Sequence, residues 1–175
     1  MNRSPIALSD LTVRIVWCFD EHWLLLTAGE NRPGAFNAMT VSWGGLGVLW
    51  GKPMALVVVR PSRYTYEFME RSESFTLCAF PAAYREALTL CGTRSGRSFD
   101  KIKAAGLTPM ASTLVAAPAY EEAELVLECR KMYYSDLEPS RFLQPDLEGN
   151  YGGRDYHRIY LGEIVAAAGT ADYAR

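Results

Sequence analysis

Three short stretches of the sequence, 37–43, 60–65 and 91–101, concentrate polar side chains next to apolar runs. They contain hydroxyl, amide and guanidinium groups and one ammonium group. Hydroxyl and guanidinium groups donate hydrogen bonds to phosphate oxygens, and an arginine can donate two at once. We therefore expect these stretches to hold a phosphate together with a flat, hydrogen-bonding ring.

The clearest candidate for the phosphate is segment 60–65, Arg-Pro-Ser-Arg-Tyr-Thr, which leaves an apolar run and enters a predicted helix. We expect Thr65 to cap the first turn of that helix. A helix start carries free backbone N–H groups and a partial positive charge, and both attract phosphate. Ser62 and Thr65 add hydroxyl donors, and Arg60 or Arg63 can pair with phosphate oxygens. The alternative is an ordinary capped helix with solvated arginines.

Segment 37–43 is predicted to be a strand with two different faces, because successive side chains of a strand point in opposite directions. The two faces carry Ala38, Thr40 and Ser42 on one side and Asn37, Met39, Val41 and Trp43 on the other. The small residues of the first face would let a flat ring approach the backbone amides. The alternative is an edge strand with one solvated face.

The loop 93–101 adds positive charge through Arg94, Arg97 and Lys101, with Ser95 among them. Positive charge beside a redox-active ring stabilises its anionic reduced form; a plain basic loop is the alternative. His157 lies near the start of the last predicted strand, where it would either bond a substrate or ring edge or serve the structure. Several aromatic residues are candidates for ring stacking, or for core and interface positions: Trp43, Trp50, Tyr64, Tyr133 and Tyr134.

Length and composition favour one globular domain over residues 1–175, with 49% hydrophobic and 22% charged residues. No apolar run reaches the ~18 residues of a membrane helix. The N-terminal residues lack the apolar core of a signal peptide, so we expect a cytoplasmic protein without a membrane partner.

Four scattered cysteines without a C-x-x-C pair and two isolated histidines argue against a structural metal site. The net charge of −2 is uneven, because residues 60–103 carry eight basic and five acidic side chains. Nucleic-acid binding usually needs a basic face across a whole domain. The small basic zone therefore favours a small anion, although ordinary surface charge is an alternative.

The pattern of many short strands and few short helices predicts a mainly β protein, a β-barrel decorated by helices. The sequence contains neither a G-x-G-x-x-G motif nor a P-loop, which is consistent with this prediction. We expect strands at 13–19, 23–28, 38–43, 54–59, 74–80, 125–133 and 156–167, with the strand at 54–59 buried centrally. Helices are expected at 65–71, 82–91 and 100–105, with Gly92 and Gly106 at their ends and a flexible glycine-rich stretch at 44–47. Segment 135–154 is a long excursion rich in proline and glycine, which is typical of a functional loop.

Taken in order, these pieces resemble the flavin reductase-like family, in particular its flavoredoxin-like branch, which is built on the FMN-binding split β-barrel of Greek-key type. The resemblance extends over nearly the whole chain. It is carried by 37–45 (Asn-Ala-Met-Thr-Val-Ser-Trp-Gly-Gly), Lys52-Pro53, 60–65, 90–97 with Asp100-Lys101, 128–131 (Glu-Cys-Arg-Lys), and Tyr156-His157 ahead of 161–163.

The resemblance implies an FMN-binding homodimer with flavin at the subunit interface. It implies that 37–43 meets the flavin ring, that Ser62, Arg63 and Thr65 meet the phosphate and ribityl chain, and that Ser95 and Lys101 complete the pocket. His157 matches a histidine that relatives place near the nicotinamide or flavin edge; in many of them it directly follows an aspartate, whereas here Tyr156 stands after Asp155.

The function implied is an oxidoreductase, an NAD(P)H-dependent flavin reductase. NADH or NADPH would pass a hydride to FMN, and electrons would go on to a second flavin, an iron centre or an acceptor protein. Two alternatives are an FMN electron carrier with little NAD(P)H activity and a non-enzymatic flavin-binding protein.

Overall fold

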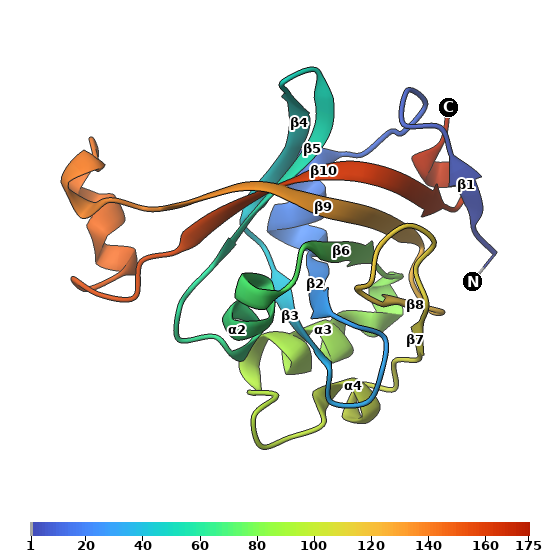
Figure 1. Ribbon diagram of the computed structural model, residues 1–175, viewed down its shortest axis with the longest axis horizontal. Coiled ribbons are helices and arrows are strands. Elements are labelled where there is room, and N and C mark those ends of the chain that lie inside the picture. The colour runs from blue at the N-terminus through green and yellow to red at the C-terminus, as the bar shows by residue number, and fades with distance from the viewer. Residues whose placement is uncertain (1) are drawn as a thin grey trace.

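An antiparallel sheet dominates the computed structural model, which describes residues 2–175. The strand order is β3-β2-β6-β9-β10-β5-β4, and β1 also pairs with β10 (Figure 1). The strands of this sheet are β1 (Ser4–Ile6), β2 (Leu24–Gly29), β3 (Phe36–Val41), β4 (Gly44–Leu49), β5 (Lys52–Val59), β6 (Ser74–Ala79), β9 (Leu125–Asp136) and β10 (Arg158–Gly169). Strands β7 (Pro109–Met110) and β8 (Ala119–Tyr120) form a separate pair.

The helical elements are short and lie between or around the strands. They are α1 (Ile15–Trp17), the π-helical turn η1 (Cys18–His22), α2 (Tyr64–Arg71), α3 (Arg85–Thr93), α4 (Lys101–Ala104) and the 3₁₀ turns η2 (Ala82–Tyr84), η3 (Pro139–Arg141), η4 (Pro145–Asn150) and η5 (Ala171–Tyr173). The prediction of a mainly β fold with a few short helices is therefore confirmed.

Two hydrophobic clusters explain why β2 opens with three consecutive leucines instead of an alternating pattern. Leu24 and Leu26 face the larger cluster inside the curved sheet, whereas Leu25 faces a second cluster on the other side. A strand covered on both faces favours apolar residues on both of them, and the one buried polar side chain of β2, Thr27, lies 3.0 Å from the Tyr120 hydroxyl. All six residues of β2 are accordingly buried.

Helices α2 and α3 pack against β3 and β2 and serve different clusters. Helix α2 buries Phe68 and Met69 in the larger cluster, and α3 buries Leu88 and Cys91 in the second. Strand β3 therefore has a helix near each of its faces. Since β3 ends the strand order, its outer edge pairs with no other strand of the described chain.

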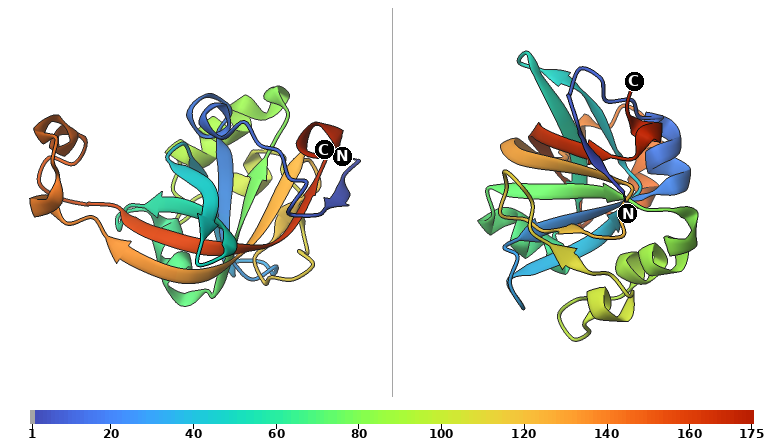
Figure 2. Two further views of the ribbon diagram at one scale, coloured as in Figure 1. Left: turned by 90° about the horizontal axis from the view of Figure 1, so that it is seen from above. Right: turned by 90° about the vertical axis from the view of Figure 1, so that its right-hand side faces the viewer.

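Strands β9 and β10 are the longest. The segment that joins them, residues 137–157 with η3 and η4, projects from the body as an arm (Figure 1 and the left panel of Figure 2). At its base, Arg158 of β10 donates hydrogen bonds to both carboxylate oxygens of Asp136 on β9, at 2.6 and 2.8 Å.

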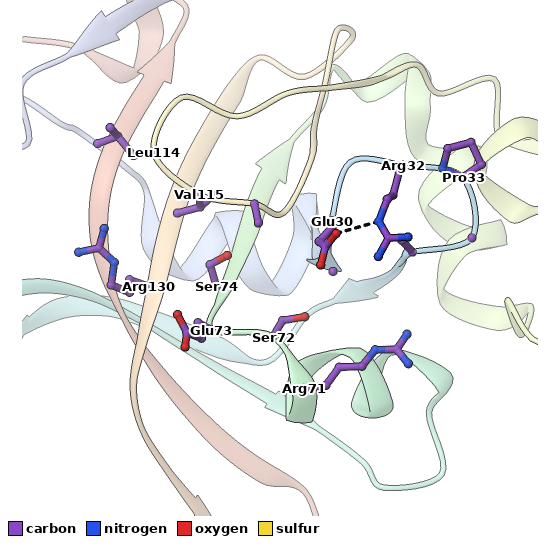
Figure 3. Close-up of a pocket in the computed structure, with 14 residues that line it drawn as sticks. Glu30, Arg32, Pro33, Arg71, Ser72, Glu73, Ser74, Leu114, Val115 and Arg130 are labelled. Carbon is purple, nitrogen blue, oxygen red and sulfur yellow. Dashed lines mark hydrogen bonds and ion pairs between the residues drawn. The ribbon is translucent and has the colours of Figure 1, made fainter.

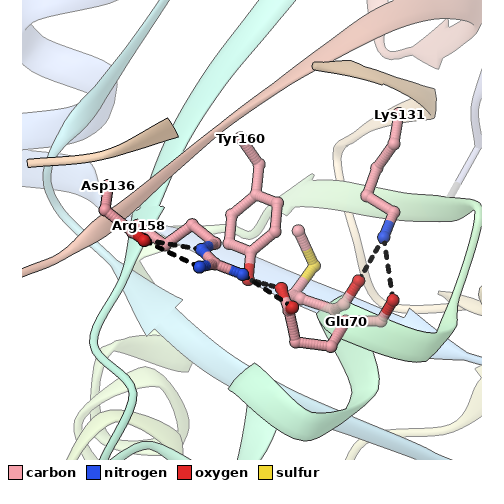
Figure 4. Close-up of polar contacts among 6 residues, drawn as sticks. Glu70, Lys131, Asp136, Arg158 and Tyr160 are labelled. Atoms are coloured by element: carbon pink, nitrogen blue, oxygen red, sulfur yellow. Dashed lines mark hydrogen bonds and ion pairs between the residues drawn. The ribbon is translucent and has the colours of Figure 1, made fainter. Parts of the chain in front are cut away.

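The base of the arm is also attached to the C-terminal end of α2 (Figure 4). Glu70 accepts hydrogen bonds from Arg158 at 2.7 Å and from the Tyr160 hydroxyl at 2.5 Å. Lys131 donates to the backbone carbonyls of Met69 and Glu70, which are free at a helix end. These contacts hold the C-terminal end of α2 against β9 and β10 and thereby help to position the first turn of the helix.

Five local expectations are wrong, beginning with the strand expected at 13–19. Residues 15–22 are helical, since a helical turn there buries Cys18 and Phe19 in the core. The glycine-rich stretch forms strand β4, and β5 alternates half-buried with buried residues instead of being buried throughout. Gly92 lies inside α3, and the N-cap of α2 is Arg63, not Thr65.

Across residues 2–175, no helix combines the length and the apolar character needed to cross a membrane. The described residues also contain no group of three or more His, Cys, Asp or Glu side chains placed to hold a metal ion.

Candidate functional site

Two adjoining cavities lie where β3, the start of α2, the loop after α3 and the base of the arm meet. The larger, about 450 Å³, is formed by Met39, Arg60, Ser62, Arg63, Tyr64, Thr65, Thr93, Arg94, Ser95, Lys101 and Asp155. The smaller, about 190 Å³, is formed by Met39, Thr40, Val41, Ser42, Trp43, Val58, Arg60, Arg63 and His157. Met39, Arg60 and Arg63 belong to both, so the two cavities make one elongated site.

Of the residues predicted from the sequence, the structure brings eleven together around these cavities: Met39, Thr40, Ser42, Trp43, Arg60, Ser62, Arg63, Thr65, Ser95, Lys101 and His157. The twelfth, Asn37, lines a neighbouring hollow beside Gly96 and Lys101. The three sequence stretches thus converge on one place, although they come from separate elements.

Asn37 does not line the two joined cavities but contacts a residue that does. It is buried, and its side-chain amide donates a hydrogen bond to the hydroxyl of Thr65 at 2.7 Å. Thr65 is itself only 1% exposed, so this hydroxyl serves the junction between β3 and α2 in addition to lining the cavity. The predicted role of Thr65 as a helix cap is replaced by this contact.

Helix α3 covers part of the predicted small-residue face of β3. Ala38 is fully buried in the cluster beneath α3, and the Thr40 hydroxyl donates to the Leu88 carbonyl of that helix. Thr40 and Ser42 of the same face nevertheless line the smaller cavity. The outer edge of β3 adds backbone N–H and C=O groups that no neighbouring strand of the described chain uses.

The corner between β5 and α2 already binds an anionic group from the chain itself. The backbone N–H of Ser62 donates to Oδ1 of Asp155 at 2.9 Å, and the Ser62 hydroxyl donates to Oδ2 at 2.6 Å. Asp155 belongs to the base of the arm. The predicted anion-binding corner therefore has donors aimed at a pair of carboxylate oxygens.

Four basic side chains line the cavity at this corner: Arg60, Arg63, Arg94 and Lys101. Arg63 donates to the Gly92 carbonyl at 2.9 Å. Arg60 donates to the Asn150 carbonyl at 2.7 Å and lies over the Tyr151 ring, 5.1 Å from its centroid. Lys101 completes the set from the first turn of α4, so the cavity is electropositive apart from Asp155.

Lys101 is a buried cation, 4% exposed, whose ammonium donates to the carbonyls of Cys91 at 3.0 Å and Arg94 at 3.2 Å. Burial, which removes hydration from the charged form, is the main reason that its pKa is lowered to about 8, and the positive charge of Arg63 contributes in the same direction. The ammonium remains mainly protonated at neutral pH. It therefore fixes the loop after α3 while facing the cavity.

His157 lies at the opposite end of the site, next to Trp43. The two rings are 5.3 Å apart between centroids, and the Tyr151 hydroxyl lies 3.0 Å from Nδ1 of His157. Burial, and then the charge of Arg60, lowers the pKa of His157 to about 4. His157 is thus neutral near pH 7 and offers a polar nitrogen without a positive charge.

A larger hollow, of about 890 Å³, lies elsewhere (Figure 3). It is bounded by the β2–β3 turn, the end of α2 and the loop at 114–116. Arg32 is paired with Glu30 at 2.8 Å, and Figure 3 shows Arg71 and Arg130 on different sides of the space. Because its charged groups do not converge, we place the functional site in the smaller, joined cavities.

Sequence reasoning missed Asp155, Thr93 and the contacts of residues 150–151 with Arg60. Thr93 belongs to segment 93–101, whose polar composition already indicated a binding role, so Thr93 could have been included from the sequence. Asp155 and Ser62 are 93 residues apart, and nothing in their local sequence pairs them.

Comparisons with known proteins identify a family and a fold. The sequence profile of the flavin reductase like domain matches residues 18–174. No curated protein matches the chain in sequence.

Three solved structures illustrate the likeness of fold. An FMN-binding domain of a flavin reductases-like enzyme from Shewanella baltica has a TM-score of 0.68 at 17% identity, over 96% of this chain and 77% of that one. A flavoredoxin from Methanosarcina acetivorans has a TM-score of 0.65 at 25% identity, over 97% and 74%. A flavin reductase-type protein with a split barrel domain from Shewanella frigidimarina has a TM-score of 0.67 at 19% identity, over 86% and 68%. The predicted split-barrel class is confirmed.

Proposed function

Because the chain belongs to the flavin reductase-like domain family, we propose that it is an FMN-binding oxidoreductase, an NAD(P)H-dependent flavin reductase. The observation that carries the proposal is the corner at Ser62, where a backbone N–H and a hydroxyl already hold two carboxylate oxygens. Phosphate oxygens accept hydrogen bonds from the same kinds of donor. The protein of Shewanella baltica named above is described as FMN-binding, which supports the choice of mononucleotide.

The phosphate end fits the residues present. Arg60 and Arg63 lie beside Ser62, and Arg94 and Lys101 add two further positive charges to the same cavity. Arg97 pairs with Glu67 and lies over the Tyr64 ring, 4.7 Å from its centroid, which ties the loop after α3 to the start of α2. The cation-bearing elements are thus held together before a ligand arrives, which lowers the cost of ordering them.

The ring end fits as well. The free edge of β3 supplies backbone donors and acceptors to the pyrimidine edge of a flavin, and Trp43 and neutral His157 border the smaller cavity. Bound FMN would supply the redox chemistry, taking a hydride from NADH or NADPH and passing electrons to a second flavin, an iron centre or an acceptor protein. The chain's residues orient the two rings, and the cations favour a negatively charged reduced state.

We include a homodimer in the proposal, with the site at the interface between copies. Val48, Leu49 and Trp50 of the β4–β5 hairpin are exposed, and Trp50 lies against Tyr133 with ring centroids 6.4 Å apart. An exposed apolar patch of this kind favours a protein partner. Trp43, 47% exposed, lies at the start of the same hairpin, so a second copy there would cover the open side of the site.

We also propose a cytoplasmic location. The four cysteines are free and buried, as expected for small apolar residues in a reducing compartment.

The visible absorption spectrum of the purified protein, followed by steady-state oxidation of NADH and NADPH with and without added FMN, tests the proposal. Rapid turnover with either nucleotide supports the reductase. A yellow protein inert to both would support an electron carrier, which the likeness to a flavoredoxin favours as the second candidate, or a non-enzymatic flavin-binding protein. If the purified protein is colourless and added FMN changes neither its spectrum nor its melting temperature, all three candidate functions are excluded.

A further inference from the structure

The carboxylate of Asp155 occupies the donors that a flavin phosphate would need. Ser62 has one backbone N–H and one hydroxyl hydrogen, and both are directed to Asp155, at 2.9 and 2.6 Å. A carboxylate only accepts hydrogen bonds. A phosphate at this corner must therefore either take the donors of Ser62 from Asp155 or lie next to a like charge without them.

The backbone around Asp155 holds the carboxylate in place. Asp155 has a φ of +57°, a left-handed conformation that is uncommon for a residue with a side chain, and it follows Gly152 and Gly153 at φ +58° and +78°. Unlike those glycines, Asp155 has a steric cost in this conformation, and its two hydrogen bonds to Ser62 offset that cost. The contact is therefore more than a chance approach of two surface groups.

The same part of the arm contacts the site at two further points. Asn150 accepts from Arg60, and Tyr151 lies under the Arg60 guanidinium and next to His157. From this part of the arm, Asp155 lines the larger cavity and His157 the smaller one. The carboxylate reaches the phosphate end, and the aromatic and imidazole groups reach the ring end.

We propose that Asp155 determines the ligand specificity of this site by competing with phosphate for Ser62. The proposal rests on the proposed flavin-binding function and goes beyond it. Asp155 disfavours FMN, whose phosphate carries negative charge, relative to riboflavin, whose terminal hydroxyl is neutral and can donate to a carboxylate. FMN is consequently an exchangeable ligand that is bound and released, and not a permanently held cofactor.

Titration of the full chain with FMN and with riboflavin, followed by flavin fluorescence, tests this competition. The informative variants are Asp155→Asn, which removes the charge and keeps the shape, and Asp155→Gly, which also suits the left-handed backbone. Asp146→Asn is the matched control, since Asp146 is an exposed aspartate of η4 that does not line the site. Circular dichroism melting of each variant shows that it is folded.

Both Asp155 variants are expected to bind FMN at least about tenfold more tightly than the unmodified chain, as expected when a like charge is removed from a binding site. Their riboflavin affinity should change by less than about threefold, and Asp146→Asn should change neither. If FMN and riboflavin gain or lose affinity by the same factor, or if FMN binds more weakly, Asp155 does not compete with phosphate and the inference is wrong. If the unmodified chain and the Asp155 variants all fail to bind either flavin, the proposed function is wrong and the inference falls with it.

Discussion

Asn37 and Thr65 are joined by a buried hydrogen bond of 2.7 Å, which connects the free edge strand β3 to the first turn of α2. The two segments that would meet opposite ends of a flavin therefore have a direct polar link. Gly96 closes this junction from the loop after α3, because a Cβ atom there would lie 2.1 Å from Oδ1 of Asn37. The three residues position strand, helix and loop relative to one another.

Replacing Gly96 with alanine should disrupt this junction. The added methyl group forces Asn37 to move, and the amide then loses its bond to Thr65, so the free energy of unfolding should fall by about 1–3 kcal/mol. Urea denaturation measures the change. Gly149→Ala is the control, since no atom lies near its added Cβ and its φ is not in the left-handed region. Equal stability of the two variants would show that Asn37 can relocate without loss.

The sequence predicted most of the site because the local chemistry of each stretch is visible in its residue types. Ser62 and Arg63 follow an apolar strand and precede a helix, and that order alone predicts an anion-binding corner. Lys101 lies at the end of the basic stretch 93–101, where that stretch enters α4. What the sequence could not supply was the pairing of these stretches, which depends on contacts across the sheet.

The errors have physical causes of the same kind. Residues 15–19 have strand-like composition, yet tertiary packing of Cys18 and Phe19 selects a helical turn. The face of β3 that carries Ala38 looked fully open because α3, about 50 residues later, covers part of it only in the folded chain. Asp155 was overlooked for the same reason, since its partner Ser62 is distant in sequence.

Arg63 should matter more for ligand affinity than for stability. It is exposed and lines both cavities, and its guanidinium donates a hydrogen bond to the Gly92 carbonyl at 2.9 Å. Arg63→Ala should weaken FMN binding by about 1.5–3 kcal/mol, the usual loss for a charge-assisted hydrogen bond, measured by fluorescence titration. Arg71→Ala, at the other end of α2, is the control and should leave the affinity unchanged. Thr65 is unsuitable for this test, because its loss would also remove the partner of Asn37.

Lys101 should make FMN affinity depend on pH in the alkaline range. Its pKa is about 8 in the folded chain, so the ammonium loses its proton, and the cavity a positive charge, as the pH rises through 8. The dissociation constant for FMN should therefore rise between about pH 7 and pH 9.5. Fluorescence titrations across this range measure it, and Lys101→Met should abolish the dependence. A slope that persists in Lys101→Met would assign the titration to another group.

The effect of Lys101 on folding stability has the opposite sign. A folded pKa of about 8 lies below the ordinary value of 10.5, so the unfolded chain binds more protons between these two values. The cost of burying the charged amine is complete below pH 8 and fades as the pH rises toward 10.5. Stability of the ligand-free chain attributable to Lys101 should thus increase over the range in which affinity for FMN falls.

Glu70 should contribute to stability through the base of the arm. Glu70→Gln weakens the acceptor for Arg158 and for the hydroxyl of Tyr160, a residue that is fully buried. We expect a loss of about 1–3 kcal/mol in the free energy of unfolding, because a buried hydroxyl loses a charged acceptor. Glu67→Gln on the same helix is the matched control: its partner Arg97 is exposed, and surface pairs contribute about 0–1 kcal/mol. If both variants lose the same free energy of unfolding, the contacts of Glu70 with Arg158 and Tyr160 contribute no more to stability than a surface ion pair.

The hairpin between β4 and β5 should control association. Val48 and Trp50 are 71% and 63% exposed, and replacing both with glutamate places like charges on each copy of a two-fold interface. Sedimentation velocity should then show a monomer where the unmodified chain is a dimer, and FMN affinity should fall as the second copy no longer covers the site. Leu114→Glu is the control, because Leu114 is 58% exposed and lies beside the large hollow, away from the hairpin. A double variant that remains dimeric and binds FMN normally would place the interface on another surface. An unmodified chain that sediments as a monomer while binding FMN would instead show that one copy forms the complete site.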